Sequence, residues 1–230
     1  MSLGRRRFLI GLALLAFVPR AQARGLEAIS GGEAAQALRD SLEQGALAAL
    51  VKLGREDGYF GDPRVKIGLP KNFRKADRIL RSLGQGKQID DMILAMNRAA
   101  EAAAPQAQEL VVDAVRKMTV RDAIDILTGG DDAATQYFRK ATEDQLREKL
   151  MPTIQSVTSQ SGLARSYNAL SATLVGLAGI RSELSTVEQY VNEKALNGIY
   201  AQIAEEERAI RRNPGQYAGS LIGKVFGLLQ

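Results

Sequence analysis

Cysteine, histidine and tryptophan are all missing from this chain of 230 residues. Without cysteine the protein forms no disulfide, has no thiolate nucleophile and cannot hold an iron–sulfur cluster. Without histidine it lacks imidazole ligands for zinc, copper or haem, and Ser-His-Asp and Cys-His catalysis are closed to it. Any chemistry would use carboxylates, lysine, tyrosine or hydroxyl groups, or Mg²⁺ or Ca²⁺ held by oxygen ligands. The sequence therefore predicts no cofactor, no metal site and no catalytic residue, and it favours a role other than catalysis.

The first 23 residues have the three-part layout of a cleavable signal peptide. Three arginines, Arg5 to Arg7, precede an apolar run of 11 residues from Phe8 to Val18, and Ala21-Gln22-Ala23 has the small residues typical of a cleavage site. The run is too short to cross a hydrocarbon core of about 30 Å, which takes about 20 helical residues. We therefore expect cleavage after Ala23 and a periplasmic protein. The segment from Arg5 to Leu9 resembles a twin-arginine export signal, but the general secretory route requires a basic start as well. The sequence therefore leaves both export routes open.

Charge is nearly balanced once the predicted signal peptide is set aside. Four of the 31 basic residues and none of the 26 acidic ones lie in residues 1–23, so residues 24–230 carry 27 basic and 26 acidic side chains. Nucleic-acid binding needs a concentrated positive face, and this composition does not predict one. Residues 24–230 are enough for a single domain with an apolar core, and no part of them predicts a membrane span.

Apolar periodicity in residues 24–230 predicts an all-α protein, a single compact multi-helix bundle. After a capping box at Ser30–Glu33, apolar residues recur every three or four positions until Gly54. A long helix is expected from about Ile89 to Met118, with a kink or break at Pro105. Between these helices the period fails at a series of breakers, so residues 57–70 are expected to be irregular, and extended at most at 65–67. The breakers are Gly58, Gly61, Pro63, Gly68 and Pro70.

Shorter helices are predicted from the capping and breaking residues between and after these segments. They are expected over 72–83, after a capping box at 119–122, from Asp131 or Asp132 after Gly129-Gly130, from Thr142 to Pro152, after Gly162, after a capping box at 185–188, and after Asn213-Pro214. The Gly129-Gly130-Asp131-Asp132 sequence is interpreted as a helix end followed by a helix start, because the nucleotide-cyclase hairpin it could suggest would need flanking strands.

With these segments in place, the chain resembles a bacterial family of exported proteins, domain of unknown function 4197, over nearly all of residues 26–227. The resemblance implies a location and an architecture, but it brings no activity, cofactor or catalytic residue. Its clearest landmarks are Asp57-Gly58-Tyr59-Phe60, Ile67-Gly68-Leu69-Pro70, Met96-Asn97-Arg98-Ala99-Ala100-Glu101, Tyr137-Phe138, Lys194-Ala195-Leu196 and Lys224-Val225-Phe226-Gly227.

Polar residues beside the apolar stripes form a candidate polar network: Asn97, Arg98, Glu101, Asp122, Lys194 and Glu206. Asn97 and Glu101 are four residues apart on one helical face, so both must be hydrogen-bonded if they are buried. We expect Glu101 to be at least half buried, to bond a donor on another helix and to share its network with Asn97. Either an inter-helix bond that fixes register or the polar wall of a pocket would explain the pair. Glu206 is expected on or near the buried face, either as a raised-pKa acid or in a salt bridge.

The sequence favours a non-catalytic binding or interaction module, whose partner is another protein. A carrier of a small apolar ligand, held in a cavity between helices, is one alternative. A carboxylate-based enzyme that uses two of Glu101, Asp122 and Glu206 is the other. These three roles predict different structures: an exposed apolar patch, a closed apolar cavity, or two carboxylates that converge in an open cleft.

Overall fold

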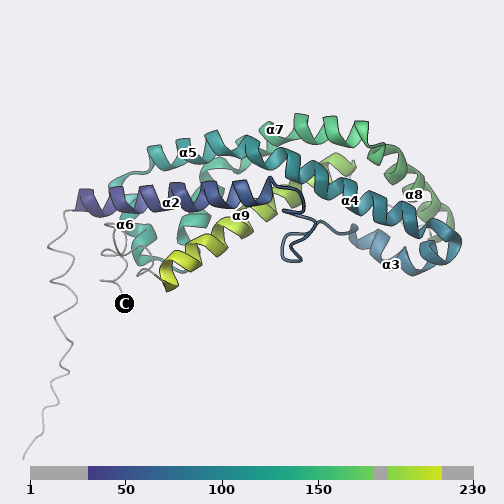
Figure 1. The fold of residues 1–230 in the computed structure, drawn as a ribbon, viewed down its shortest axis with the longest axis horizontal. Coiled ribbons are helices and arrows are strands. Elements are labelled where there is room, and N and C mark those ends of the chain that lie inside the picture. The colour runs from purple at the N-terminus through teal and green to yellow at the C-terminus, as the bar shows by residue number, and fades with distance from the viewer. Residues whose placement is uncertain (1–30, 179–185, 214–230) are drawn as a thin grey trace, which may run out of the picture.

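The computed structural model describes residues 31–178 and 186–213, and within these ranges it contains helices and no strand, so the all-α prediction is confirmed (Figure 1). The helices lie roughly along one curved long axis, with α3 and α8 at one end and α6 at the other. The elements are α2 (Gly31–Leu53), α3 (Lys71–Leu80), a π-helical turn η1 (Arg81–Gln85), α4 (Gly86–Ala103), a 3-10 turn η2 (Ala104–Ala107), α5 (Gln108–Lys117), α6 (Val120–Thr128), α7 (Ala133–Gln160), α8 (Leu163–Ala178) and α9 (Val187–Arg212).

The core forms around α9, which packs against α7, α2 and α4, while α4 also packs against α7. The apolar stripe of α9 is buried throughout, at Val187, Val191, Ala195, Ile199 and Ile203. Burial of such a stripe is the main source of stability for a helix in a small protein. No helix in the described ranges has an apolar stretch long enough to cross a membrane.

The break predicted at Pro105 is present as the 3-10 turn between α4 and α5. Proline cannot donate the helical hydrogen bond at this position, so the chain tightens for one turn and then resumes as α5. The same turn contacts the end of α2: a Cβ atom added at Gly54 would lie 2.9 Å from Cγ of Pro105. Glycine at position 54 therefore both ends α2 and lets it approach the proline.

The helices predicted to start at Asp131 or Asp132 and at Thr142 form a single helix, α7, which continues without interruption past Thr142 and Pro152. Thr142 does not start a helix; its hydroxyl donates to the carbonyl of Phe138 and hydrogen-bonds the Tyr200 hydroxyl. Pro152 is exposed, and the buried side chains on the opposite face, Leu150 and Ile154, keep their helical spacing across it. Tertiary burial thus outweighs the local cost of proline.

Other helix ends differ from the predicted ones by a few residues. Regular α-helix ends at Leu80 instead of residue 83, and Gly84 turns the chain with a φ of 80°. The cap of α9 is Thr186, whose side chain accepts the amide hydrogen of Gln189, one residue later than the predicted box. The Thr119–Asp122 capping box is confirmed. The predicted signal peptide and the expected helix after Asn213-Pro214 lie outside the described residues.

Candidate functional site: an anchored loop beside a basic groove

Residues 54–70, here called the α2–α3 loop, connect α2 to α3 and contain no regular helix or strand. The loop lies beneath α4 and alongside α9 in Figure 1. Short backbone turns fold its first half, in which Gly61 donates to the Asp57 carbonyl and Val65 to that of Asp62. Asp57 takes a φ of 61°, a left-handed conformation that its short polar side chain tolerates. The irregular segment predicted at residues 57–70 is therefore confirmed.

The carboxylate of Glu101, on α4, is buried and holds the first half of this loop. Only 4% of the residue is exposed. Its Oε1 atom accepts the amide hydrogens of Tyr59 and Phe60, at 3.0 Å each, and its Oε2 atom accepts a 2.6 Å bond from Nη1 of Arg98. The predicted burial is confirmed, but the prediction of a donor on another helix is wrong: the donors belong to the loop and to α4 itself. A buried carboxylate needs such partners, because its desolvation is otherwise uncompensated.

Arg98 extends this cluster to the surface. Its Nη2 atom lies 2.8 Å from Asp57 and 3.2 Å from Glu56, two exposed carboxylates at the start of the loop. The hydrogen bond to Glu101, with that to Asp57, raises the pKa of Arg98, so the guanidinium stays charged. The cation thus joins a buried anion to two exposed ones, and it ties the turn at residues 56–58 to α4.

Asn97 holds the second half of the loop, one turn before Glu101 on α4. The residue is fully buried. Its Oδ1 atom accepts the amide hydrogen of Ile67 at 2.8 Å, and its Nδ2 atom donates to the Ile67 carbonyl at 2.8 Å and to that of Ile93 at 2.7 Å. The amide side chain therefore pairs with both backbone groups of one residue, as a neighbouring strand would. Asn97 and Glu101 bind two parts of the same loop.

Two tyrosines attach the loop to α9. The Tyr59 hydroxyl donates to the Ala195 carbonyl, and the Tyr190 hydroxyl donates to the Gly68 carbonyl, both at 2.8 Å. Complete burial raises the pKa of Tyr59, and Glu101 raises it further. A Cβ atom added at Gly198 would lie 2.4 Å from Cε1 of Tyr59, so glycine is needed where the ring meets α9.

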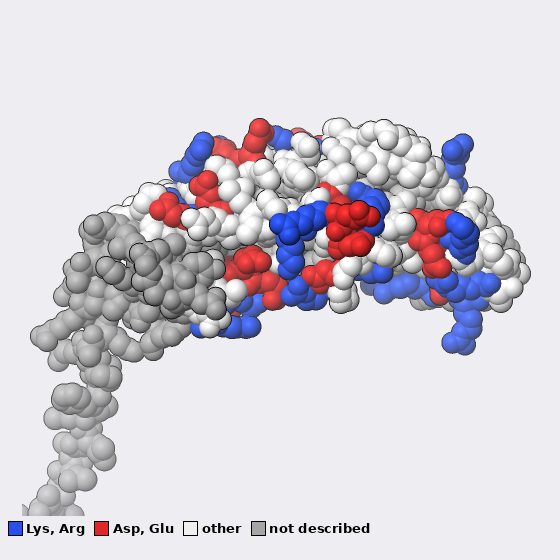
Figure 2. All heavy atoms as spheres, viewed as in Figure 1, with Lys and Arg blue, Asp and Glu red and all other residues white. Residues whose placement is uncertain are grey.

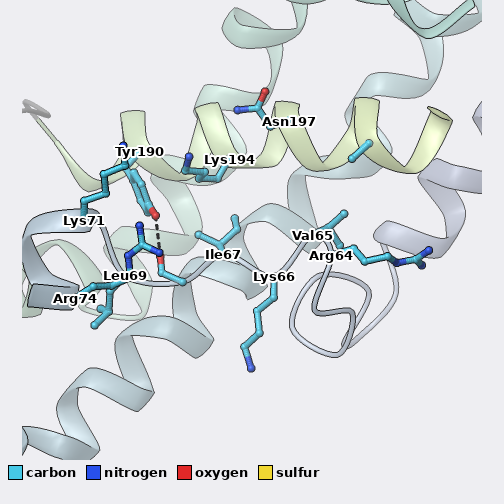
Figure 3. Close-up of a pocket in the computed structure, with 12 residues that line it drawn as sticks. Arg64, Val65, Lys66, Ile67, Leu69, Lys71, Arg74, Tyr190, Lys194 and Asn197 are labelled. Atoms are coloured by element: carbon cyan, nitrogen blue, oxygen red, sulfur yellow. Dashed lines mark hydrogen bonds between the residues drawn. The ribbon is translucent and has the colours of Figure 1, made fainter. Parts of the chain in front are cut away.

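A groove of about 420 Å³ opens between the second half of the loop, the first turn of α3 and α9 (Figure 3). Five basic side chains line it, and no aspartate or glutamate of the described chain does: the cations are Arg64, Lys66, Lys71, Arg74 and Lys194. Tyr190 and Asn197 complete the polar lining. Figure 3 shows Lys71, Arg74 and Lys194 gathered around Tyr190, whereas Lys66 points away from them. Lys66 instead lies 3.7 Å from the ring centroid of Phe60.

Of the six residues of the candidate polar network, only Arg98 and Glu101 bond each other; Asn97 binds another part of the loop, so the prediction that it shares a network with Glu101 is wrong. Asp122 belongs to the capping box of α6, where it bonds Thr119, and this bond lowers its pKa. Lys194 lies on α9, where it lines the groove beside Tyr190. Glu206 is half-buried and accepts a hydrogen bond from Gln202. The prediction that Glu206 lies on or near the buried face is therefore confirmed, and its hydrogen-bond donor is a glutamine.

The buried acid of α9 is Glu207, which sequence reasoning missed. It is 3% exposed and accepts the amide hydrogens of Ala134 and Thr135, at 3.0 and 2.9 Å, and the Thr135 hydroxyl at 2.9 Å. Arg211, one turn later, adds a 2.9 Å bond. Glu207 thus caps the start of α7, where the side chain of Asp132 makes no capping bond. The signal was in the sequence, because Glu207 continues the four-residue series of the α9 stripe after Ile203.

No group of three or more acidic side chains that could hold a metal ion occurs in the described ranges. The loop carboxylates that could have served calcium are paired with arginines instead. Asp62 bonds Arg64 at 2.6 Å, and this hydrogen bond lowers the pKa of Asp62 to about 2. The features of the site that could bind a ligand are therefore the fixed backbone of the loop and the basic groove.

Comparison with known proteins places the chain in a family and goes no further. A family model described as protein of unknown function (DUF4197) matches residues 28–227, nearly the whole chain. No curated protein and no solved structure matches it.

Proposed function

The chain belongs to the DUF4197 family, whose description carries no activity, and we propose that it is an exported helical protein that acts by binding, not by catalysis. The binding element is the α2–α3 loop with the groove beside it. One observation carries this proposal: two buried side chains of α4, Asn97 and Glu101, each form two hydrogen bonds to the backbone of an irregular loop.

Such a loop is unusual in a helical protein. Connections between packed helices mostly span about 2–8 residues, and longer irregular loops are commonly functional. A loop that only had to join α2 to α3 would not need buried amide and carboxylate anchors, which are costly to desolvate. Fixing a surface before its ligand arrives lowers the entropic cost of binding. The anchors therefore support a preorganised binding surface.

The arrangement of carboxylates gives no support to the enzyme alternative. Glu101 is saturated by two amides and an arginine, Asp122 caps α6, and Glu206 bonds a neighbouring glutamine. Each of the three acids belongs to a separate set of hydrogen bonds, so they do not form the converging pair that general acid–base catalysis requires. The basic lining of the groove likewise favours a polar ligand over the purely apolar one that a carrier would hold.

Export is the second part of the proposal, and it rests on the layout of residues 1–23. Protein recovered from the periplasm should begin at Arg24 when its N-terminus is sequenced. An intact N-terminus, or recovery from the cytoplasm alone, would contradict export. Replacement of Arg5, Arg6 and Arg7 by lysine should slow export by the twin-arginine route and leave the general secretory route unaffected.

The binding proposal can be tested by native mass spectrometry of protein purified from the periplasm. The wild type should carry a noncovalent ligand or partner whose mass is lost in a double variant of the groove, Arg74→Ala with Lys194→Ala. A double variant with the same loss of charge, Lys87→Ala with Lys117→Ala, should retain it, because these exposed lysines pair with Asp91 and Asp113 on other surfaces. Wild-type protein without any bound species, or equal retention in both variants, would overturn the proposal.

A further inference from the structure

Three cations of the groove, Lys71, Arg74 and Lys194, have no carboxylate of the described chain close enough to neutralise them, whereas Arg64, which also lines the groove, pairs with Asp62 at 2.6 Å. Arg98, Arg81, Lys87 and Lys117 each lie within 3.2 Å of at least one carboxylate. Within the described ranges, by contrast, Lys71 and Arg74 form no ion pair, and Lys194 has only a 3.9 Å contact with its neighbour Glu193. Figure 2 shows the same contrast: basic side chains gather along the lower edge over α3, while acidic and basic groups lie side by side on the face above.

These cations meet the positive end of a helix. α3 starts at Lys71, and its cap residue, Pro70, offers no side-chain hydrogen bond. Arg74 makes the first backbone bond, to the Pro70 carbonyl, so the amides of residues 71–73 precede the helical ladder. The first turn holds no acid and two cations, which is the reverse of the arrangement that favours a helix start. An anion in the groove would satisfy both the amides and the side chains.

Tyr190 borders the same place as a neutral side chain, whose hydroxyl hydrogen is donated to the Gly68 carbonyl. Burial raises its pKa to about 12 even though the charge of Arg74 acts in the opposite direction, so the hydroxyl is protonated at neutral pH. The effect of Arg74 on Tyr190 agrees with Figure 3, where the guanidinium lies beside the tyrosine hydroxyl. Lys194 lies on the other side of the ring, 5.5 Å from its centroid. Three cations and a helix start thus surround one position at the end of the groove.

We propose that this end of the groove binds the phosphate of an organic phosphomonoester, held by Lys71, Arg74, Lys194 and the first amides of α3. This inference rests on the proposed function and names the ligand class of the same groove. A phosphomonoester carries nearly two negative charges and three acceptor oxygens, which match three cations better than a single carboxylate does. Arg74 supplies the planar fork, and the lysines act as point charges.

The size of the groove indicates that the ligand is larger than phosphate alone. Its volume of about 420 Å³ lies in the range of sites for small organic molecules. From the cationic end the groove continues along the backbone of Val65–Gly68 towards Asn197 and Ala201. The organic part of the ligand would occupy this length, against a backbone that Asn97 holds in place. The anchored loop therefore shapes the part of the site that recognises the rest of the molecule.

Isothermal titration calorimetry with phenyl phosphate, at low ionic strength, tests the proposal directly. The protein should bind phenyl phosphate on the order of tenfold or more tightly than benzoate, which has a similar ring and one charge. The Arg74→Gln and Lys194→Gln double variant should lose on the order of tenfold or more in affinity, and Lys117→Gln should lose none. Both variants alter exposed or half-exposed side chains, and an unchanged melting temperature would confirm their folding.

Vesicle sedimentation identifies the source of the phosphate. Vesicles of phosphatidylcholine with phosphatidic acid would carry the protein down if the phosphate is a lipid headgroup, and phenyl phosphate alone would bind if the ligand is soluble; either result supports the proposal. No binding of either probe, equal binding of benzoate, or full binding by the double variant would overturn it. If native mass spectrometry still showed a groove-dependent ligand, the phosphate assignment alone would fail and the binding proposal would stand.

Discussion

Two buried glutamates, Glu101 on α4 and Glu207 on α9, use the same chemistry at two places in the molecule. Each is less than 5% exposed, accepts two backbone amide hydrogens, and pairs with an arginine one turn away on its own helix. Glu207 receives its amides from the first turn of α7, and it therefore completes a regular element. Glu101 receives them from an irregular loop that borders a basic groove. The same set of bonds is structural in one place and shapes a candidate binding site in the other.

The arginine that pairs with each glutamate distinguishes the Glu207 cluster from the Glu101 cluster. Arg211 is largely buried and donates a second bond to the Ile126 carbonyl, so the Glu207 cluster is closed by protein groups and joins α9 to α6 and α7. Arg98 reaches the surface, where its other partners, Glu56 and Asp57, are exposed. Loss of Glu207 should therefore loosen the bundle, whereas loss of Glu101 should act mainly on the α2–α3 loop.

The largest expected effect follows from Glu207→Ala. This change leaves the Ala134 and Thr135 amides and the Arg211 guanidinium without their partner, and removal of one member of a buried ion pair costs about 3–5 kcal/mol. Urea unfolding should show this loss in the free energy of unfolding. The neighbouring change Glu206→Ala is the control, with a smaller cost of about 1 kcal/mol, because it removes only the hydrogen bond from Gln202. Equal costs at the two positions would contradict the assignment of Glu207 as the cap of α7.

A smaller and more local effect is expected from Glu101→Gln. The carboxamide is close to the carboxylate in shape, but it loses the charge-assisted bond to Arg98 and can turn a donor towards the loop amides, at a cost of about 1–3 kcal/mol. The groove should bind its ligand more weakly because the first half of the loop is freed and the groove wall is then held by Asn97 and Tyr190 alone. Unfolding by urea and titration of the groove measure the two effects. A large loss of stability with unchanged groove affinity would make Glu101 merely structural, like Glu207.

The smallest expected effect comes from Tyr190→Phe, which removes a single hydrogen bond to the Gly68 carbonyl at about 0.5–1.5 kcal/mol. This change also has a pH signature. Burial raises the folded-state pKa of Tyr190 to about 12 from 10.0, so its contribution is complete below pH 10 and is lost as the pH rises to about 12. The free energy of unfolding should therefore decline less over this window in the variant. An identical decline in both proteins would remove Tyr190 from the set of loop anchors.

The sequence predicted the loop and its anchors better than the groove. Glycine and proline spacing located residues 57–70, and the four-residue step from Asn97 to Glu101 placed both on a buried face. Glu207 was missed because Glu206, three residues after Ile203 and four before Ile210, was chosen over the residue that continues the four-residue series of the stripe. The helix end predicted at Pro152 was wrong because the burial of Leu150 and Ile154 outweighs the local cost of a proline inside the helix. The groove could not be foreseen, since Arg74 and Lys194 lie far apart in the sequence and meet only when the loop packs against α9.

Amide hydrogen exchange of the wild type, Glu101→Gln and Glu207→Gln, read at the α2–α3 loop, tests most directly whether Glu101 fixes this loop. In the wild type the Tyr59, Phe60 and Ile67 amides should exchange slowly, because buried side chains accept their hydrogens. Glu101→Gln should speed exchange at Tyr59 and Phe60 while α7 stays protected, and Glu207→Gln should give the opposite pattern at Ala134 and Thr135. Fast exchange of the loop amides in the wild type, or the same pattern in both variants, would contradict the claim that Glu101 fixes the loop independently of the bundle.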